Sequence, residues 1–377
     1  MPVKPRVISA DDHVQEPPDL WTKRLSKRWG DRVPQVARQA DGVERWVIDG
    51  RLLEASSLTR TGALSNERHQ EPQTWDQVPQ AAFDPDARLK AMDEDGVEVQ
   101  VLYPGTSGVS GEVLGRIEDP TLEIECVGAY NDWLLETWAD ASPRFVPQCI
   151  LPISSVSAAV SETKRAVGMG HRGVIMPPAP WHVRPDAPHI HDDRWDPLWA
   201  TIQDLDVPVC WHSGGDLNVL LEIYPGFGPA MTKAFDSIRR PISSAQVLVN
   251  FLLSGIGERF PGLKVVFTAT GIDWVPSQLE LCDHQAENAM LEKEGMTIQP
   301  SEIFHRQCYV TTWFDRAGMR IRSDVGLGNI LWQSEFPLET STWPRSAELI
   351  EGNFAGVPQN ERDLILFGNA AKLYRVE

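Results

Sequence analysis

Two histidines and two acids stand at the ends of apolar runs, where their side chains could hold a metal ion. The first run ends in Asp11-Asp12-His13. Residues i and i+2 of a strand point to the same side, so Asp11 and His13 can reach one ion together. Two later runs end in His212 and Glu335. Two imidazoles with one or two carboxylates suit Zn²⁺, Fe²⁺ or Mn²⁺, and such an ion can acidify a bound water or polarise a carbonyl.

Each of these residues also has a purely structural interpretation. Asp11 and His13 could be a hydrogen-bonding pair at a strand end. His212 could be a buried core histidine, and Glu335 could be a salt-bridge partner. Their joint placement at the ends of three strands favours a site for one or two divalent ions. His212 and Glu335 are also the predicted catalytic residues, since a carboxylate beside the ion can move a proton.

The elements that must position these residues follow from the hydrophobic pattern. Eight short apolar runs, most of them β-branched, predict parallel strands buried on both faces, and helical stretches alternate with them. This alternation predicts an α/β fold, a distorted (β/α)8 TIM barrel with its chemistry at the carboxyl ends of the strands. An open doubly wound sheet is the alternative, but it would want a glycine-rich phosphate turn after the first strand. The expected strands are Arg6–Val14, Val97–Pro104, Pro147–Ile153, Arg172–Pro177, Val207–His212, Lys264–Thr270, Gln307–Phe314 and Asn329–Phe336. The expected helices are Thr121–Ala139, Ser155–Val167, Trp195–Asp206, Ile242–Arg259, Val275–Leu291 and Glu361–Tyr374.

One long segment does not fit the alternation. We expect residues 1–377 to form a single barrel domain, within which Pro17–Asp84 is too long for a simple βα loop. Asp49-Gly50 signals a hairpin inside this segment, so we expect an insertion that acts as a lid over the barrel mouth. Trp211, Trp274 and Trp332 lie near strand ends and are predicted to line an apolar substrate pocket, although packing alone would also explain them.

Composition limits the partners and the compartment. The formal net charge is −18, which argues against nucleic acid and anionic membranes as partners and leaves a small-molecule substrate. Five scattered cysteines without a C-x-x-C motif predict buried, reduced thiols. No window is apolar enough to span a membrane, and the first residues do not resemble a signal peptide. We therefore expect a cytoplasmic protein.

Motifs along nearly the whole chain resemble a known family. The chain is similar to the amidohydrolase-related family that contains aminocarboxymuconate-semialdehyde decarboxylase and the resorcylate decarboxylases. The resemblance implies a metal held by Asp11, His13, His212 and the acid of the eighth strand, and a further catalytic or ligating His or Glu at the end of the sixth. It also implies a possible homodimer, for which Pro17–Asp84 and Glu361–Tyr374 are plausible contact elements. The matching segments are Ser9–Trp21, Ala129–Trp133, Gly170–Val174, Trp195–Trp199, Trp211–Gly215, Phe260–Phe267, Leu331–Pro337 and Gly368–Tyr374.

Two positions depart from the family pattern. Ala269 stands where the family usually has Glu or His, and Glu335 followed by Phe-Pro-Leu338 stands where it usually has Asp followed by Tyr-Pro-His. Proton transfer would then fall to Glu335. A dinuclear site bridged by Glu335, or an inactive protein that keeps the fold, are the alternatives. Weaker substitutes for the missing base, each expected at the surface, are Asp12, Asp273, His284 and Glu339.

Three functions are compatible with these residues. The leading prediction is a metal-dependent hydrolase, in which metal-activated water attacks an ester, thioester or amide of a bulky apolar or ring-containing acyl group. The alternative is a metal-dependent, non-oxidative decarboxylase of an aromatic or unsaturated carboxylic acid, against whose usual form Ala269 and Leu338 count. A non-catalytic ligand-binding barrel is the third hypothesis.

Overall fold

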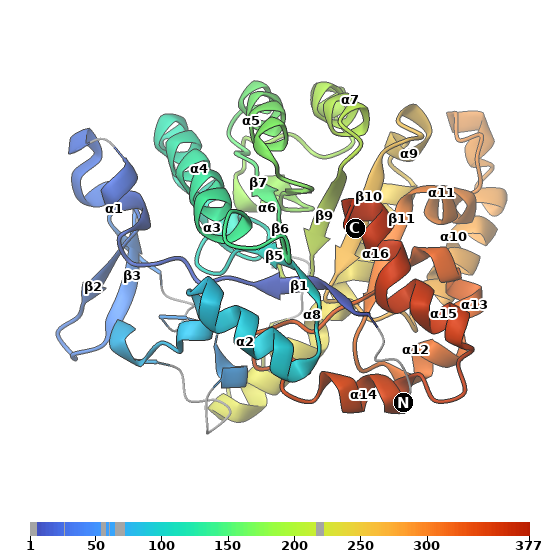
Figure 1. Ribbon diagram of the computed structural model, residues 1–377. Coiled ribbons are helices and arrows are strands. Elements are labelled where there is room, and N and C mark those ends of the chain that lie inside the picture. The colour runs from blue at the N-terminus through green and yellow to red at the C-terminus, as the bar shows by residue number, and fades with distance from the viewer. Residues whose placement is uncertain (1–5, 26, 54–57, 60, 65–71, 216–221) are drawn as a thin grey trace.

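Eight parallel strand segments surround a central core in the part of the chain that the structure, a computed structural model, describes: residues 6–25, 27–53, 58–59, 61–64, 72–215 and 222–377 (Figure 1). The third segment is made of two short strands, β6 and β7, separated by Gln148. All eight predicted strands are present, with shorter bounds. They are β1 (Ile8–His13), β5 (Val99–Tyr103), β6 (Phe145–Pro147) with β7 (Cys149–Ile150), β8 (Val174–Ile175), β9 (Pro208–His212), β10 (Lys264–Thr268), β11 (Cys308–Thr312) and β12 (Ile330–Trp332).

Backbone hydrogen bonds close these strands into a ring. The strands pair in the orders β1-β5-β6 and β7-β8-β9-β10-β11-β12. The first gap is bridged where Arg172 N donates to Pro147 O at 2.9 Å. The second is bridged where Glu335 N donates to Asp11 O at 3.0 Å and His13 N donates to Phe336 O. The predicted barrel is therefore confirmed, and its closure brings the first and last strands together.

The continuous apolar character of the strands follows from burial on both faces. Val266 and Leu331 pack in the core cluster that also contains β1 and β5 side chains. Their neighbours Val265 and Ile330 pack in the other cluster, with helix residues such as Phe251. Successive strand residues thus alternate between the barrel interior and the helical layer.

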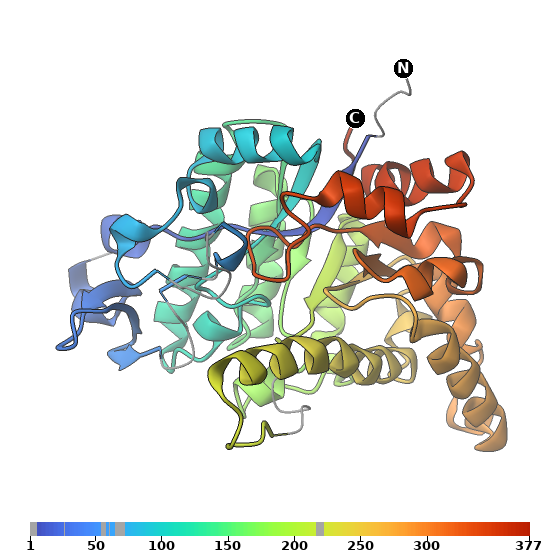
Figure 2. The same cartoon turned by 90° about the horizontal axis from the view of Figure 1, so that it is seen from below.

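Helices surround the strands, and five of the six predicted helices lie close to their expected positions. The predicted helix Ile242–Arg259 is wrong in its bounds: it is two helices, the first beginning at Pro229 and the second following Gly255, whose left-handed backbone (φ 74°) interrupts the helix. Figure 2 shows α8 crossing the end of the molecule that is seen from below. The larger helices are α2 (Pro85–Asp95), α4 (Pro120–Leu134) continued by a π-turn (Leu135–Ala139), α5 (Val156–Met169), α7 (Asp196–Asp204), α8 (Pro229–Leu252), α9 (Ile256–Arg259), α10 (Val275–Asn288), α11 (Pro300–Gln307), α14 (Ser346–Asn353), and α15 (Gln359–Asp363) followed by α16 (Asn369–Tyr374).

The segment after β1 forms a small sheet of its own. Strands β2 (Gln35–Arg38), β3 (Glu44–Ile48) and β4 (Arg51–Leu52) pair antiparallel, and the predicted hairpin at Asp49-Gly50 is confirmed, with φ of 51° and 73°. Figure 1 shows this sheet to one side of the barrel. Ala63 nearer the end of the segment donates to Pro337 O at 3.1 Å, beside the barrel mouth. Part of the segment lies outside the described residues, so its action as a lid stays a prediction.

Two predictions from composition can be compared with the fold. The cysteines are buried and free, as expected: Cys126, Cys149, Cys210, Cys282 and Cys308. Within the described residues, no helix combines the length and the apolar sequence that crossing a bilayer requires.

Candidate metal centre

Asp11, His13 and His212 meet at the mouth of the barrel. Nε2 of His13 lies 3.4 Å from Oδ1 of Asp11, and Nε2 of His212 lies 3.3 Å from Oδ2. One ligand atom from each residue lies within 4.8 Å of the others. In the described part of the chain, this is the only group of three or more such residues with that geometry. The three predicted ligands therefore come together, from the ends of β1 and β9, in a geometry that could hold a divalent ion.

The backbone orients both imidazoles. Nδ1 of His13 lies 3.0 Å from Pro104 O, and Nδ1 of His212 lies 2.6 Å from Ser213 O. A carbonyl oxygen only accepts, so each Nδ1 carries the proton, which leaves the lone pair of each Nε2 directed at the ligand site. Bonds of this kind are the usual outer shell of a metal-binding histidine.

The buried polar atoms of the site fit a cation. Asp11 is fully buried, and among the described residues neither of its oxygens, nor Nε2 of His212, has a hydrogen-bond partner. Burying a carboxylate without compensation is costly, and a cation bound between these atoms would remove that cost. Burial works against protonation of His212, but the charges of Asp11 and Glu335 raise its pKa.

Glu335 lies next to these ligands but outside their group. It follows β12, is 6% exposed, and has left-handed backbone (φ 58°). Its N–H donates to the carbonyl of Asp11, so the two acids are held on adjoining strands. A non-glycine residue in this conformation carries strain, which accumulates at functional sites. Glu335 as a fourth ligand, and a second ion, stay predictions.

Asp12 does not lie at the surface, contrary to the sequence-based expectation. It is fully buried, and its Oδ1 accepts from Ser334 Oγ and from Phe336 N, the latter at 3.0 Å. Burial raises its pKa, and the field of Arg88 opposes that shift. Asp12 therefore holds the segment that carries Glu335 against the strand that carries two ligands.

Arg88 is the second buried support that the sequence did not reveal. Its Nη2 donates to His13 O at 2.7 Å, and its Nε donates to Ala81 O at 2.6 Å. Nη1 donates to Gln100 at 3.0 Å, and the guanidinium lies 4.3 Å from the Phe336 ring centroid. The only available signal was an arginine in a helix that borders the barrel, which by itself predicts a solvated side chain.

At the end of β10, the sixth barrel strand, position 269 contributes backbone hydrogen bonds and no basic side chain. Ala269 has left-handed backbone (φ 56°). Its N–H donates to Gln333 Oε1 at 3.0 Å, and its carbonyl accepts from Ser213 Oγ at 2.8 Å. Of the other suggested bases, Asp273 and His284 are exposed and Glu339 is half-buried.

The tryptophans predicted to line a pocket lie mainly in the helical layer. Trp211 is 2% exposed and its ring is 5.7 Å from that of Phe251 on α8, while Trp332 is fully buried in the same cluster. Trp211 must face outward because its neighbour His212 faces inward. Trp274, partly buried, packs against that cluster and donates to Thr270 O.

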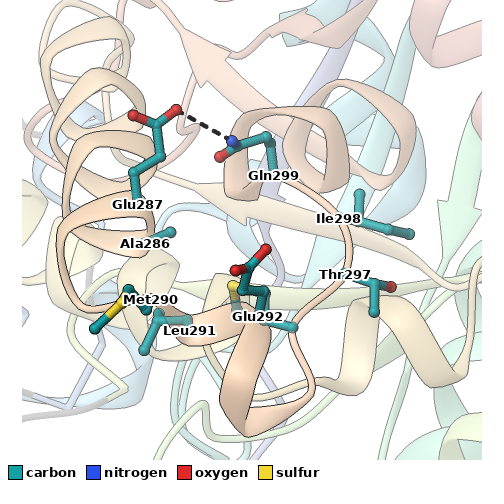
Figure 3. A pocket seen from close by; sticks show the side chains of 9 residues that line it. Ala286, Glu287, Met290, Leu291, Glu292, Thr297, Ile298 and Gln299 are labelled. Atoms are coloured by element: carbon teal, nitrogen blue, oxygen red, sulfur yellow. Dashed lines mark hydrogen bonds between the residues drawn. The ribbon is translucent and has the colours of Figure 1, made fainter.

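Two described cavities differ in their relation to the ligands. One, beside His13, has about 10 Å³ of free space, room for a single water, and the residues around it include Gln15, Thr61, Val109 and Leu338. The other, of about 340 Å³, lies at the end of α10, and Glu287 and Gln299 meet at its edge (Figure 3). None of the three ligand-type residues lines this larger pocket, so its position separates it from the group at the barrel mouth.

Comparisons with known proteins agree with the barrel fold. The family model for amidohydrolases matches residues 33–376. A gamma-resorcylate decarboxylase from Polaromonas sp. is 26% identical over 77% of this chain and 87% of its own, and one from Rhodococcus jostii is 25% identical over 80% and 91%. An amidohydrolase from Mycobacterium avium subsp. paratuberculosis has the same fold, with a TM-score of 0.79, 21% identity and coverage of 99% and 100%. A manganese-bound dihydroxybenzoic acid decarboxylase from Polaromonas sp. aligns over 99% and 97%, with a TM-score of 0.65 and 19% identity.

The relatives overturn the leading functional prediction. The hydrolysis of an ester, thioester or amide was wrong, because the similar curated proteins are decarboxylases of aromatic acids. The residues alone could not make this distinction, since one set of imidazole and carboxylate ligands serves several reactions. The barrel, the three buried ligands and a family match that spans most of the sequence lead to one conclusion: the chain is an enzyme of the amidohydrolase family.

Proposed function

We propose that this protein is a metal-dependent, non-oxidative decarboxylase of an aromatic carboxylic acid. The observation that carries the proposal is a second buried carboxylate, Glu335, held beside a three-residue metal site by a backbone bond to the ligand Asp11. The curated gamma-resorcylate decarboxylases support the same reaction class.

The site residues divide the work of this reaction. Asp11, His13 and His212 would hold a divalent ion, which supplies positive charge to bind and orient the substrate carboxylate. Glu335 delivers the proton. The bond between the ring carbon and the carboxylate carbon breaks, its electron pair stays on the ring carbon, and that carbon takes the proton of Glu335 as CO₂ leaves. A proton from solvent then restores Glu335.

The sixth barrel strand, β10, does not end in an acid or a base, which supports Glu335 as the proton donor. Ala269 has no ionisable group, and Asp273 and His284 are exposed. Asp12 is buried, but its Oδ1 already accepts two hydrogen bonds. Glu335 is therefore the acid best placed to donate a proton at the mouth.

The test measures loss of 2,6-dihydroxybenzoate and release of CO₂ by the manganese-loaded protein. Glu335→Gln keeps the shape of the side chain but removes its acid, and we expect kcat to fall about 10²- to 10⁴-fold with metal content unchanged. Asp273→Asn is the control, because it changes an exposed carboxylate that follows β10 rather than β12.

Two results would contradict the proposal. One is a Glu335→Gln variant with the kcat of the wild type. The other is a metal-loaded wild type that releases no CO₂ from 2,6-dihydroxybenzoate or from a panel of hydroxylated benzoates.

A further inference from the structure

Two buried polar atoms at the barrel mouth have no use within the protein itself. Thr268 and Gln333 are both fully buried. Among the described residues, Oγ1 of Thr268 and Nε2 of Gln333 have no hydrogen-bond partner. A buried group left unsatisfied costs free energy that the fold has no reason to spend, so each such group needs an explanation.

Strand geometry directs both side chains to the barrel interior. Val266 and Leu331 lie in a different core cluster from their neighbours Val265 and Ile330, which pack with helix residues such as Phe251, and residues two apart on a strand share a face. Thr268 therefore shares the face of Val266, and it pairs in register with the ligand His212. Gln333 continues the β12 ladder through its N–H to Thr312 O at 3.0 Å, so it shares the face of Leu331.

The orientation of the Gln333 amide is determined by its one partner. Oε1 accepts the N–H of Ala269 at 3.0 Å, and only an oxygen can accept it. The NH₂ group is therefore the end of the amide that has no hydrogen-bond partner among the described residues. The bond from Ala269 places this amide beside the residue that follows Thr268, and Gln333 itself lies two positions before Glu335 in the sequence. A Glu or His at position 269 would have placed an ionisable side chain next to Oγ1 of Thr268 and Nε2 of Gln333.

We propose that Nε2 of Gln333 and Oγ1 of Thr268 form a neutral subsite that binds a ring hydroxyl of the aromatic acid. The inference rests on the proposed function and deepens it. The amide N–H donates to the hydroxyl oxygen, and the threonine oxygen accepts the hydroxyl proton. A hydroxyl matches this pair because it both accepts and donates, whereas a carboxylate only accepts.

Thr268→Val separates this role from a structural one. Valine has nearly the shape of threonine but lacks the hydroxyl. Because that hydroxyl makes no hydrogen bond among the described residues, the variant should keep or raise the thermal midpoint while it loses affinity for hydroxylated ligands. A hydroxyl with a structural role would instead lower the midpoint when removed.

The experiment is calorimetric titration of the manganese-loaded protein with 2,6-dihydroxybenzoate and with benzoate, in a Glu335→Gln background that prevents turnover. The measured quantity is the ratio of the two dissociation constants. We expect Thr268→Val to reduce the preference for the hydroxylated acid about 3- to 10-fold. Gln333→Glu keeps an acceptor for the N–H of Ala269 but replaces the donor, and should reduce the preference for the hydroxylated acid at least as much.

Thr311→Val is the matched control. Thr311 is a buried threonine on the neighbouring strand β11, opposite Leu331, and its hydroxyl already donates to Phe267 O at 3.5 Å. This variant should leave the preference unchanged.

The outcomes distinguish failure of the subsite from failure of the proposed reaction. If the wild type releases no CO₂ but the preference is present and falls in Thr268→Val, the subsite stands and the decarboxylase proposal fails. If CO₂ is released but both variants keep the full preference, the subsite is overturned. Equal binding of the two acids by the parent protein overturns it as well.

Discussion

Arg88 offers the sharpest test of how the barrel supports its ligands. Replacing Arg88 with Met removes a fully buried cation while keeping much of the apolar volume. The variant leaves the carbonyls of His13 and Ala81 and the amide oxygen of Gln100 without their donor. It also removes the positive field that acts on the buried carboxyl of Asp12.

The expected cost follows from these contacts. Three hydrogen bonds from a charged donor would add up to more than about 4 kcal/mol at the usual value for each, but the losses are not additive. Each buried oxygen left without its donor costs about 1 to 3 kcal/mol, so we expect Arg88→Met to cost about 3 to 5 kcal/mol in total. Asp12→Asn combined with Arg88→Met should cost less than the sum of the single variants, by about 1 kcal/mol or more, because the two sites are coupled.

The assay is urea unfolding followed by tryptophan fluorescence, on protein freed of metal with a chelator. Metal must be removed because a ligand that binds only the folded state adds stability and would hide the change. Arg345→Met is the control, since Arg345 is exposed and pairs with Glu348 at the surface, and its urea midpoint should not change. An Arg88→Met midpoint as little changed as that of the control would refute the reasoning, as would strictly additive costs for the double variant.

Three further predictions concern the metal, the pH and the backbone. His212→Ala should reduce bound metal to well below one equivalent per chain by elemental analysis, because it removes one of three ligands; full metal content would contradict the site. Burial lowers the pKa of His171 to about 4, below the unfolded value of about 6.5, so the unfolded state takes up the proton first as pH falls. The free energy of unfolding should therefore drop by about 2 kcal/mol between pH 7.5 and 5 in urea titrations, and a His171→Gln variant should lose that component; an unchanged pH dependence in the variant would exclude this role. Ala269→Gly should raise the free energy of unfolding by about 1 kcal/mol, since glycine adopts φ 56° without strain; a lower urea midpoint would show that the strain is absent.

The sequence alone was enough to predict the barrel and the meeting of Asp11, His13 and His212 at its mouth. Strand runs buried on both faces have a distinct apolar pattern, and residues at their carboxyl ends converge on one face of a barrel. The same pattern also predicts the orientation of Trp211: because its neighbour His212 faces the interior, the tryptophan faces the helices and not the substrate pocket. Leu331 and Gln333 are two residues apart and share a face of the strand, so the sequence also predicts that Gln333 faces the barrel interior.

Only the tertiary structure decided which polar groups support the site. Arg88 reaches His13 across 75 positions of the sequence, and Ser334 reaches Asp12 across 322. Such contacts depend on ring closure between β12 and β1, which no local pattern encodes. The left-handed backbone at Glu335 and Ala269 was equally unpredictable, because neither residue type favours it and only the surrounding hydrogen bonds hold it. Local periodicity determined where the strands end, whereas the closed barrel determined which atoms meet there.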